Sequence, residues 1–358
     1  MADLSVVLCG IKLRNPLVLA SGPLSWSAAG IRAAFEAGAA AVVTKTIRVT
    51  AATNPRPHIA AAGHRSMLNT EAWSDLPAQQ WIEQEIPSLS DRKGVLIAST
   101  GHTPEEVKHL ARPLARIGAD MLELVSYRAQ DAAPMVAVAK RTVSIPVLVK
   151  VSANWPDLVG IVKACLQAGA DGITAIDSLG PALRVDVETR KPVLGSFAWL
   201  SGEAILPAAL ASVASIRLEH GDSCSVVGTG GVTGARDVLE MLMVGATAVG
   251  VHSAPLLQGL GWFDKTLTQL TAWLDARTHT DLSSLRGTAL QSLKEPFVSP
   301  VVTFSFDANA CTLCGRCETV CAYGARRVLP GPEMRLDTVL CRSCSLCTSV
   351  CPTGALRA

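Results

Sequence analysis

Eight of the 11 cysteines lie between residues 311 and 351, in two quartets of identical spacing. Each quartet reads C-x2-C-x2-C-x3-C, the spacing that wraps thiolates around a [4Fe–4S] cluster. The quartets are Cys311, Cys314, Cys317 and Cys321, then Cys341, Cys344, Cys347 and Cys351. The sequence therefore predicts that the last part of the chain folds around two clusters, which carry single electrons.

The two quartets are expected to exchange their fourth cysteines, because three closely spaced cysteines can face one cube while the fourth leaves the loop to ligate the other cluster. The first cluster then takes Cys311, Cys314, Cys317 and Cys351, and the second takes Cys341, Cys344, Cys347 and Cys321. Proline follows the second quartet as Pro352. Ala322 stands at the corresponding place after the first quartet, which removes no ligand.

Disulfides and structural zinc are the alternative uses of so many cysteines. Disulfides form in exported proteins, and the N-terminal segment Met1-Ala-Asp-Leu-Ser5 lacks the basic and long apolar regions of a signal peptide. Structural zinc seldom combines eight ligands at this doubled spacing. Cys9, Cys165 and Cys224 are scattered in apolar surroundings and are expected to stay reduced and buried. We therefore expect a cytoplasmic protein.

The composition limits the remaining function classes. The 358 residues carry 32 basic and 30 acidic side chains, a net charge of +2, which leaves no basic footprint for a nucleic acid. Gly, Pro or charged residues interrupt the apolar runs before they reach the length of a membrane span. We expect neither a nucleic-acid partner nor a membrane partner.

Before the cysteines, short apolar runs alternate with helical stretches, the pattern of βα units around a parallel sheet. Eight runs are strand candidates: Leu17–Ser21, Ala41–Thr46, Val95–Ser99, Met121–Ser126, Val147–Ser152, Gly172–Asp177, Ser225–Thr229 and Ala248–His252. They predict an α/β fold with a (β/α)8 barrel. A doubly wound sheet is disfavoured because the early part of the chain has no G-x-G-x-x-G motif. The predicted organisation is a barrel over residues 1–293, a linker over 294–306 and a ferredoxin-like 2[4Fe–4S] domain over 307–358.

Three stretches interrupt the alternation. Ser5–Leu13 is expected to form a hairpin that plugs the bottom of the barrel. Arg48–Asp75 follows the second strand and Ser178–Ser201 follows the sixth. Because loops that follow barrel strands lie at the catalytic mouth, we expect these two excursions to cover a substrate.

Glycines and lysines at strand ends indicate a flavin site. Gly230, Gly231 and Ser253 lie in the loops after strands seven and eight, which often hold a phosphate in such barrels; glycines that serve only tight turns are the alternative. Lys45 and Lys150 end two apolar strands, either to offset the charge of a reduced flavin or to form structural ion pairs. A flavin links one-electron clusters to two-electron substrates, so FMN fits both halves of the chain.

Several motifs resemble the dihydroorotate dehydrogenase superfamily. They are Asn15-Pro-Leu-Val-Leu-Ala-Ser-Gly22, Val42-Val-Thr-Lys-Thr46, Met67-Leu-Asn69, Leu148-Val-Lys150, Ser201-Gly202 and Gly228-Thr-Gly-Gly231. With the cysteine-rich tail, nearly the whole chain is similar to the FMN- and iron–sulfur-containing portion of dihydropyrimidine dehydrogenases. The resemblance implies that FMN is bound by Ala20, Ser21, Gly22, Lys45, Thr46, Asn69, Lys150, Ser178, Ser201, Gly202, Gly230, Gly231, His252 and Ser253.

The substrate side departs from that resemblance. After the fourth strand the family has an Asn-x-Ser-Cys-Pro stretch and a loop with the catalytic cysteine or serine. This chain has Val125 in place of the asparagine and continues directly into a helix. The family's asparagine after the sixth strand is Asp177 here, so only Asn69 remains of the three amides that read a pyrimidine. Pyrimidine reduction is therefore not expected.

Other polar side chains are candidates for the missing roles. Tyr127 and His102 lie just past strand ends and can carry a proton, although packing is the alternative role for each. Asn69, Asp177 and Arg56 are candidates to hold the substrate, with Arg56 suited to a carboxylate or phosphate.

The leading interpretation is an FMN- and 2[4Fe–4S]-dependent oxidoreductase that acts on a C=C or similar bond of a small non-pyrimidine molecule. The retained excursion Arg48–Asp75 favours this enzyme. One alternative is an electron-transfer subunit that serves a partner protein, which the loss of the acid loop favours. Another is the catalytic subunit of a dihydropyrimidine dehydrogenase. A tRNA dihydrouridine synthase is disfavoured because the chain has almost no net charge. Because no NAD-binding motif is visible, ferredoxin or a separate NAD(P)H/FAD reductase subunit is the expected electron partner. We expect a homo-oligomer or a hetero-oligomer.

Overall fold

The structure is a computed structural model that describes residues 2–294 and 302–358. The chain divides into two compact units, Met1–Lys294 and Glu295–Ala358. Most of the expected linker, residues 295–301, lies outside the described residues. Ser305 and Phe306, also assigned to the linker by the sequence analysis, instead form strand β17 and pair with Arg357 and Leu356. The second unit therefore begins before residue 307.

The first unit is a closed barrel of eight parallel strands in the order β10-β15-β16-β3-β4-β7-β8-β9. The strands are β3 (Leu17–Leu19), β4 (Ala41–Val43), β7 (Val95–Gly101), β8 (Met121–Val125), β9 (Val147–Val151), β10 (Gly172–Ala175), β15 (Ser225–Thr229) and β16 (Ala248–Val251). Each lies within or overlaps one of the eight predicted runs, which confirms the barrel. Continuous apolar runs suit these strands because both faces of the sheet are covered.

Helices surround the barrel, and their ends follow from local sequence. They are α1 (Ala28–Glu36), α3 (Pro104–Arg116), α4 (Ala129–Thr142), α5 (Leu158–Gln167), α6 (Leu206–His220), α7 (Ala235–Met243), α8 (Ser253–Gln258), α9 (Trp262–Asp275) and α10 (Leu290–Lys294). Short helical turns are Pro23–Ser25, Ala78–Gln80 (α2), Trp81–Glu85, Pro87–Leu89, Glu203–Ile205 and Ser283–Leu285. Helix α3 begins where Thr103 accepts a hydrogen bond from the Glu106 amide, and α5 begins where Asp157 does so from Gly160.

The predicted N-terminal hairpin closes the bottom of the barrel. Strands β1 (Val6–Leu8) and β2 (Ile11–Leu13) pair antiparallel, and their Leu8 and Leu13 are fully buried. These two side chains cluster with apolar residues of the barrel interior such as Val18 and Leu148. The hairpin thus excludes water from the end of the barrel opposite the strand carboxyl ends.

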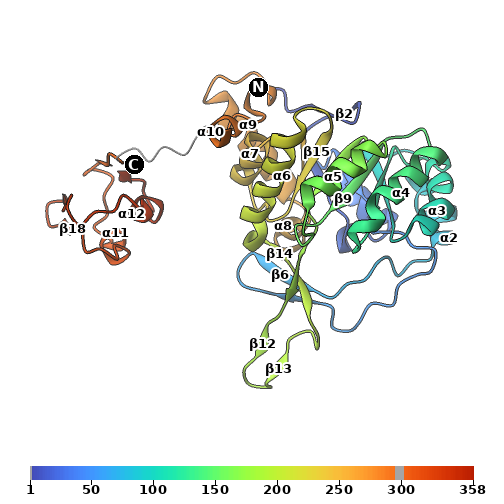
Figure 1. Ribbon diagram of the computed structural model, residues 1–358, viewed down its shortest axis with the longest axis horizontal. Helices are drawn as coiled ribbons and strands as arrows, with labels where there is room; N and C mark the ends of the chain where they lie inside the picture. Colours follow the sequence, from blue (N-terminus) through green and yellow to red (C-terminus); the bar gives the residue numbers. More distant parts are fainter. Residues whose placement is uncertain (1, 295–301) are drawn as a thin grey trace. The chain divides into compact units, whose positions relative to one another are not determined.

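The two long excursions fold together at the other end. Strands β5 (Ile59–Ala61) and β6 (Ser66–Asn69) come from the first excursion, and β11 (Leu179–Ala182) and β14 (Ala198–Gly202) from the second. They form one sheet in the order β11-β14-β6-β5. Between β11 and β14, β12 (Val185–Asp186) and β13 (Lys191–Pro192) form a hairpin that projects from the barrel (Figure 1).

The second unit contains two similar halves. Strand β17 (Ser305–Phe306) pairs with β20 (Leu356–Arg357), and β18 (Arg326–Leu329) pairs with β19 (Glu333–Leu336). The short helices α11 (Arg316–Thr319) and α12 (Leu346–Ser349) each carry the third cysteine of a quartet. This arrangement is the ferredoxin-like domain that the cysteine spacing predicts.

Candidate functional site

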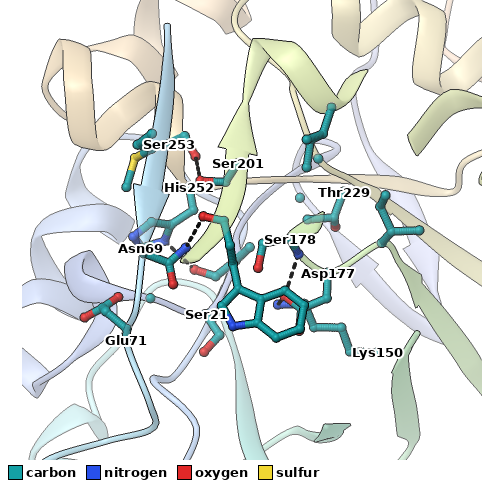
Figure 2. Close-up of a pocket in the computed structure, with 18 of the residues that line it drawn as sticks. Ser21, Asn69, Glu71, Lys150, Asp177, Ser178, Ser201, Thr229, His252 and Ser253 are labelled. Carbon is teal, nitrogen blue, oxygen red and sulfur yellow. Dashed lines mark hydrogen bonds and ion pairs between the residues drawn. The ribbon is translucent and has the colours of Figure 1, made fainter. Parts of the chain in front are cut away.

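A large pocket lies at the carboxyl ends of the barrel strands, under the sheet of the two excursions. Its volume is about 1040 Å³, including the part that opens to solvent. Residues that follow β3, β4, β8, β10, β15 and β16 form the walls. Figure 2 shows Asn69, Lys150, Asp177 and Ser201 gathered around this space from separate elements.

The structure brings all fourteen residues of the expected FMN site to this one pocket. They are Ala20, Ser21, Gly22, Lys45, Thr46, Asn69, Lys150, Ser178, Ser201, Gly202, Gly230, Gly231, His252 and Ser253. The sequence analysis missed Glu71, Trp73, Trp199 and Thr229, which also line it. Alternation could have found Trp199, which lies two residues before Ser201 in the same strand, β14 (Ala198–Gly202). Glu71 and Trp73 follow the end of β6, where no alternation signal applies.

The loops after β15 and β16 leave space and donors for a phosphate. A Cβ atom on Gly231, whose φ is +81°, would lie 2.4 Å from the Leu206 amide nitrogen, so only glycine fits there. The hydroxyl of Ser253 donates to Ser201 Oγ at 3.1 Å across the pocket. Thr229 Oγ1 is buried and has no hydrogen-bond partner among the described residues. These features fit a bound phosphorylated cofactor such as FMN.

Lys150 and Asp177 lie together at the floor of the pocket. Lys150 Nζ lies 3.0 Å from Asp177 Oδ1. One layer deeper, Glu123 is only 2% exposed; its Oε2 accepts a hydrogen bond from Thr174, whereas Oε1 has no partner among the described residues. Burial raises the pKa of Glu123. For Lys150, burial lowers the pKa, but the negative charges of Asp177 and Glu123 outweigh burial, so the pKa of Lys150 is raised overall. Lys150 therefore remains a cation at the pocket floor.

The other predicted lysine is also paired. Lys45 is buried at the end of β4 and forms an ion pair with Glu71, which lies after β6. His58 Nε2 lies 3.8 Å from the same carboxylate. The pocket thus holds two lysines, each beside a carboxylate, so the ion pairs of the sequence analysis are present. That the lysines offset the charge of a reduced flavin stays a prediction.

His252 links the loops after β3 and β16 as a neutral imidazole. Its Nδ1 lies 2.8 Å from the carbonyl oxygen of Ala20, to which it donates, so Nε2 is left to accept from the Leu24 amide at 3.4 Å. Burial, together with the positive charges of Lys150 and Lys45, lowers the pKa of His252 to about 4, although the Ala20 hydrogen bond opposes this.

The flavin-free protein is expected to lose stability between pH 6.5 and pH 4 because of this histidine. The unfolded chain binds a proton at His252 near pH 6.5, whereas the folded chain does so only near pH 4, so acidification favours unfolding by up to about 3 kcal/mol over that range. Urea unfolding at several pH values should show a shallower pH dependence for His252→Gln than for the natural protein. His109→Gln, in the exposed part of α3, is the control; equal slopes for all three proteins would contradict the prediction.

Aromatic side chains form the wall where a substrate would lie. The ring of Tyr127 stacks on Trp73 at 4.7 Å and on Trp199 at 5.4 Å. Strand β8 ends at Val125 and α4 begins at Ala129, so there is no room between them for a catalytic loop. Burial raises the pKa of Tyr127, which keeps its hydroxyl protonated.

Two predicted catalytic or substrate residues do not line the pocket. His102 lies behind Tyr127, its ring 5.6 Å from the tyrosine ring and 5.4 Å from that of Trp73. Arg56 is exposed in an irregular part of the first excursion, away from the pocket lining. Both residues lie near the mouth along the chain. The packing of the aromatic wall keeps His102 out of the pocket lining, and the course of the first excursion does so for Arg56. Asn69 and Asp177 do line the pocket.

The eight tail cysteines surround two separate cavities. One is lined by Cys311, Cys314, Cys317 and Cys351 and measures about 350 Å³, including the part that opens to solvent. The other is lined by Cys321, Cys341, Cys344 and Cys347 and measures about 320 Å³ on the same basis. These sets correspond to the crossed assignment derived from the spacing. All described cysteines are free. A cavity ringed by four thiols fits a [4Fe–4S] cube.

Comparisons with known proteins agree with both units. The dihydroorotate dehydrogenase family matches residues 3–274, and a 4Fe-4S binding domain matches residues 303–325. The chain is 30% identical over 310 residues to the dihydroorotate dehydrogenase B (NAD(+)) catalytic subunit of Methanothermobacter thermautotrophicus, covering 80% of this chain and 98% of the relative. It is 33% identical over 270 residues to the protein of the same name from Methanopyrus kandleri, covering 70% and 84%.

Proposed function

The chain belongs to the dihydroorotate dehydrogenase family of flavin-dependent oxidoreductases, and we propose that it uses FMN and two [4Fe–4S] clusters to reduce or oxidise a double bond in a small non-pyrimidine molecule. The observation that carries the proposal is the aromatic and aliphatic wall of Val125, Tyr127, Trp73 and Trp199 in the pocket. Val125 in this wall replaces an asparagine of the family that the chain resembles, and the chain lacks that family's cysteine loop.

The pocket residues have separable roles in this proposal. Bound FMN would supply the exchange between one-electron and two-electron chemistry. Gly230, Gly231 and Ser253 would hold its phosphate, and Lys150 would place a positive charge at the pocket floor. Tyr127 is the candidate proton donor, since its protonated hydroxyl borders the same pocket.

Asn69 is poorly placed to read a pyrimidine. Its amide nitrogen already points to the carbonyl oxygen of Trp199 at 3.5 Å. Asp177 accepts from the Ser178 amide and pairs with Lys150, so it presents carboxylate oxygens instead of amide donors. A substrate that donates hydrogen bonds or carries positive charge would suit Asp177 better than an imide.

A second candidate function is an electron-transfer subunit with no small substrate of its own. The stacked rings of Trp73, Tyr127 and Trp199 favour it, because they occupy part of the pocket mouth. A third candidate is the catalytic subunit of a dihydropyrimidine dehydrogenase. The two cysteine quartets support it, and the missing acid loop opposes it. In each of these functions a ferredoxin or a separate reductase subunit would exchange electrons with the clusters. The protein would be a homo-oligomer or a hetero-oligomer, and the name of the relatives, catalytic subunit, supports a hetero-oligomer.

An anaerobic screen distinguishes the two candidates. The flavin is photoreduced and its absorbance is followed after adding unsaturated small molecules, including cationic and donor-rich ones, or reduced and oxidised ferredoxin. Rapid reoxidation by a small molecule supports the enzyme. Reoxidation by ferredoxin alone, across a broad metabolite set, supports the electron-transfer subunit and rejects the leading proposal.

The anaerobically reconstituted protein is expected to hold eight iron, eight sulfide and one FMN per chain, because each cluster of the proposed pair takes four iron and four sulfide and the pocket holds one flavin. Metal analysis and flavin fluorescence measure these contents. Cys351→Ala should damage the cluster of Cys311, Cys314 and Cys317, since Cys351 lines their cavity. Four iron in the natural protein, zinc in its place, or loss of the other cluster's EPR signal in Cys351→Ala would contradict the two-cluster arrangement.

A further inference from the structure

A buried arginine lies at one of the two cysteine-lined cavities. Arg326, the first residue of β18, is only 3% exposed and lines the cavity of Cys321, Cys341, Cys344 and Cys347. Its guanidinium carbon lies 4.4 Å from the centre of the Phe304 ring. This stacking holds the side chain in place without neutralising its charge.

The guanidinium lacks a counter-ion in the described part of the chain. Arg326 Nη2 is buried without a hydrogen-bond partner there, and no described carboxylate forms an ion pair with Arg326. A buried, unpaired cation is costly because it has lost its hydration. An anionic group in the adjacent cavity would remove that cost, and a cluster bound by four thiolates is such a group.

Among the described residues, no buried arginine lines the other cavity. Burial raises the pKa of Cys317 there, and the charge of Arg326 partly opposes that rise from outside the cavity lining. The cavity of Cys311, Cys314, Cys317 and Cys351 is lined by apolar side chains such as Val328 and Met334, and its single arginine, Arg316, is exposed to solvent. Water and salt screen an exposed charge, whereas a buried charge acts through a medium of low dielectric constant. The two cavities therefore differ in electrostatics although their cysteine spacings are identical.

We propose that Arg326 makes the cluster held by Cys321, Cys341, Cys344 and Cys347 the easier of the two to reduce, and so sets the order in which the clusters accept electrons. Reduction adds one electron, and hence one negative charge, to a cluster without breaking a bond. A buried cation stabilises the reduced form more than the oxidised form, because the attraction grows with the charge of the cluster. A single-electron donor protein would then leave its first electron on this cluster. The inference rests on the proposed presence of two clusters.

The test is a redox titration of the reconstituted full-length protein, followed by EPR, with dithionite as reductant. Arg326→Met removes the charge and keeps much of the length; Arg326→Gln is a second neutral variant if methionine weakens cluster retention. Arg326→Lys keeps the charge. Arg327→Met, at the exposed neighbouring position, is the matched control.

In Arg326→Met, reduction of one cluster should become at least tenfold less favourable, a shift of about 59 mV to lower potential for a one-electron couple. That cluster must be the one whose signal is lost in Cys344→Ala. Arg326→Lys should retain most of the natural potential, and Arg327→Met all of it. If both neutral variants hold eight iron per chain and their potentials are unchanged, or if the potential of the other cluster shifts instead, the proposed role of Arg326 is wrong but the two-cluster proposal stands. Four iron per chain in the natural protein overturns the two-cluster proposal as well.

Discussion

Lys150→Met is expected to destabilise the flavin-free barrel unit by up to about 3–5 kcal/mol, the cost of removing one partner from a fully buried ion pair, because the side chains of Lys150 and Asp177 are only 11% and 25% exposed. The lysine is the only described cation paired with Asp177, and it also offsets the charge of Glu123 one layer deeper. Methionine fills a similar volume, so the loss reports charge more than packing. Urea unfolding at neutral pH measures the change.

The destabilisation by Lys150→Met should depend on pH. Burial already raises the pKa of Glu123 above its value in the unfolded chain, and without the Lys150 cation it should rise further. Protonation of Glu123 then favours the folded state, so the variant's deficit should shrink as the pH falls toward 5 and grow as it rises. Lys163→Met, at an exposed position of α5, is the control and should change stability little. A loss at Lys150 that is independent of pH would argue that packing, not charge, is responsible.

Uracil, thymine and orotate are expected to turn over at least 10²- to 10⁴-fold more slowly than in a dihydropyrimidine dehydrogenase assayed beside this protein. Absence of a general acid typically costs that factor. Each polar group of the pyrimidine edge left without a partner costs a further 1–3 kcal/mol or so. Val125 offers no hydrogen bond, Asp177 is paired with Lys150, and β8 leads directly into α4.

Steady-state turnover with a competent electron donor, in both directions, measures the rates. Ferricyanide reduction by the photoreduced flavin serves as the control that the flavin itself is active. Uracil reduction at a rate comparable to the reference enzyme would sink the non-pyrimidine assignment. In that event Tyr127→Phe would show whether the Tyr127 hydroxyl takes the place of the absent cysteine.

Much of the fold could be predicted because its signals are local. Each barrel strand is a short apolar run of its own, such as Val147–Val151, and buried parallel strands need no partner pattern beyond that. Strand carboxyl ends meet at one mouth in any such barrel. The family resemblance assigned Ala20, Lys150 and His252 to one site, and the structure places all three in one pocket at that mouth.

The substrate side was less predictable because it depends on pairing between distant segments. Trp199 faces Asn69 across β14 and β6, 130 residues apart in the chain. Only that pairing brings Trp73, Tyr127 and Trp199 into one stack and places His102 behind it. The sequence placed Arg56 correctly in the first excursion, but it could not show that its side chain is exposed instead of lining the pocket.

The sequence alone determined the barrel and the grouping of the cysteines into two crossed sets, because periodicity and spacing along the chain encode them. The tertiary structure decided which ionisable side chains are buried. Glu123 and Arg326 look like ordinary strand residues in the sequence, yet they are 2% and 3% exposed beside cavities. The physical reason is that desolvation depends on every element packed around a side chain, and those elements are brought together only by the fold.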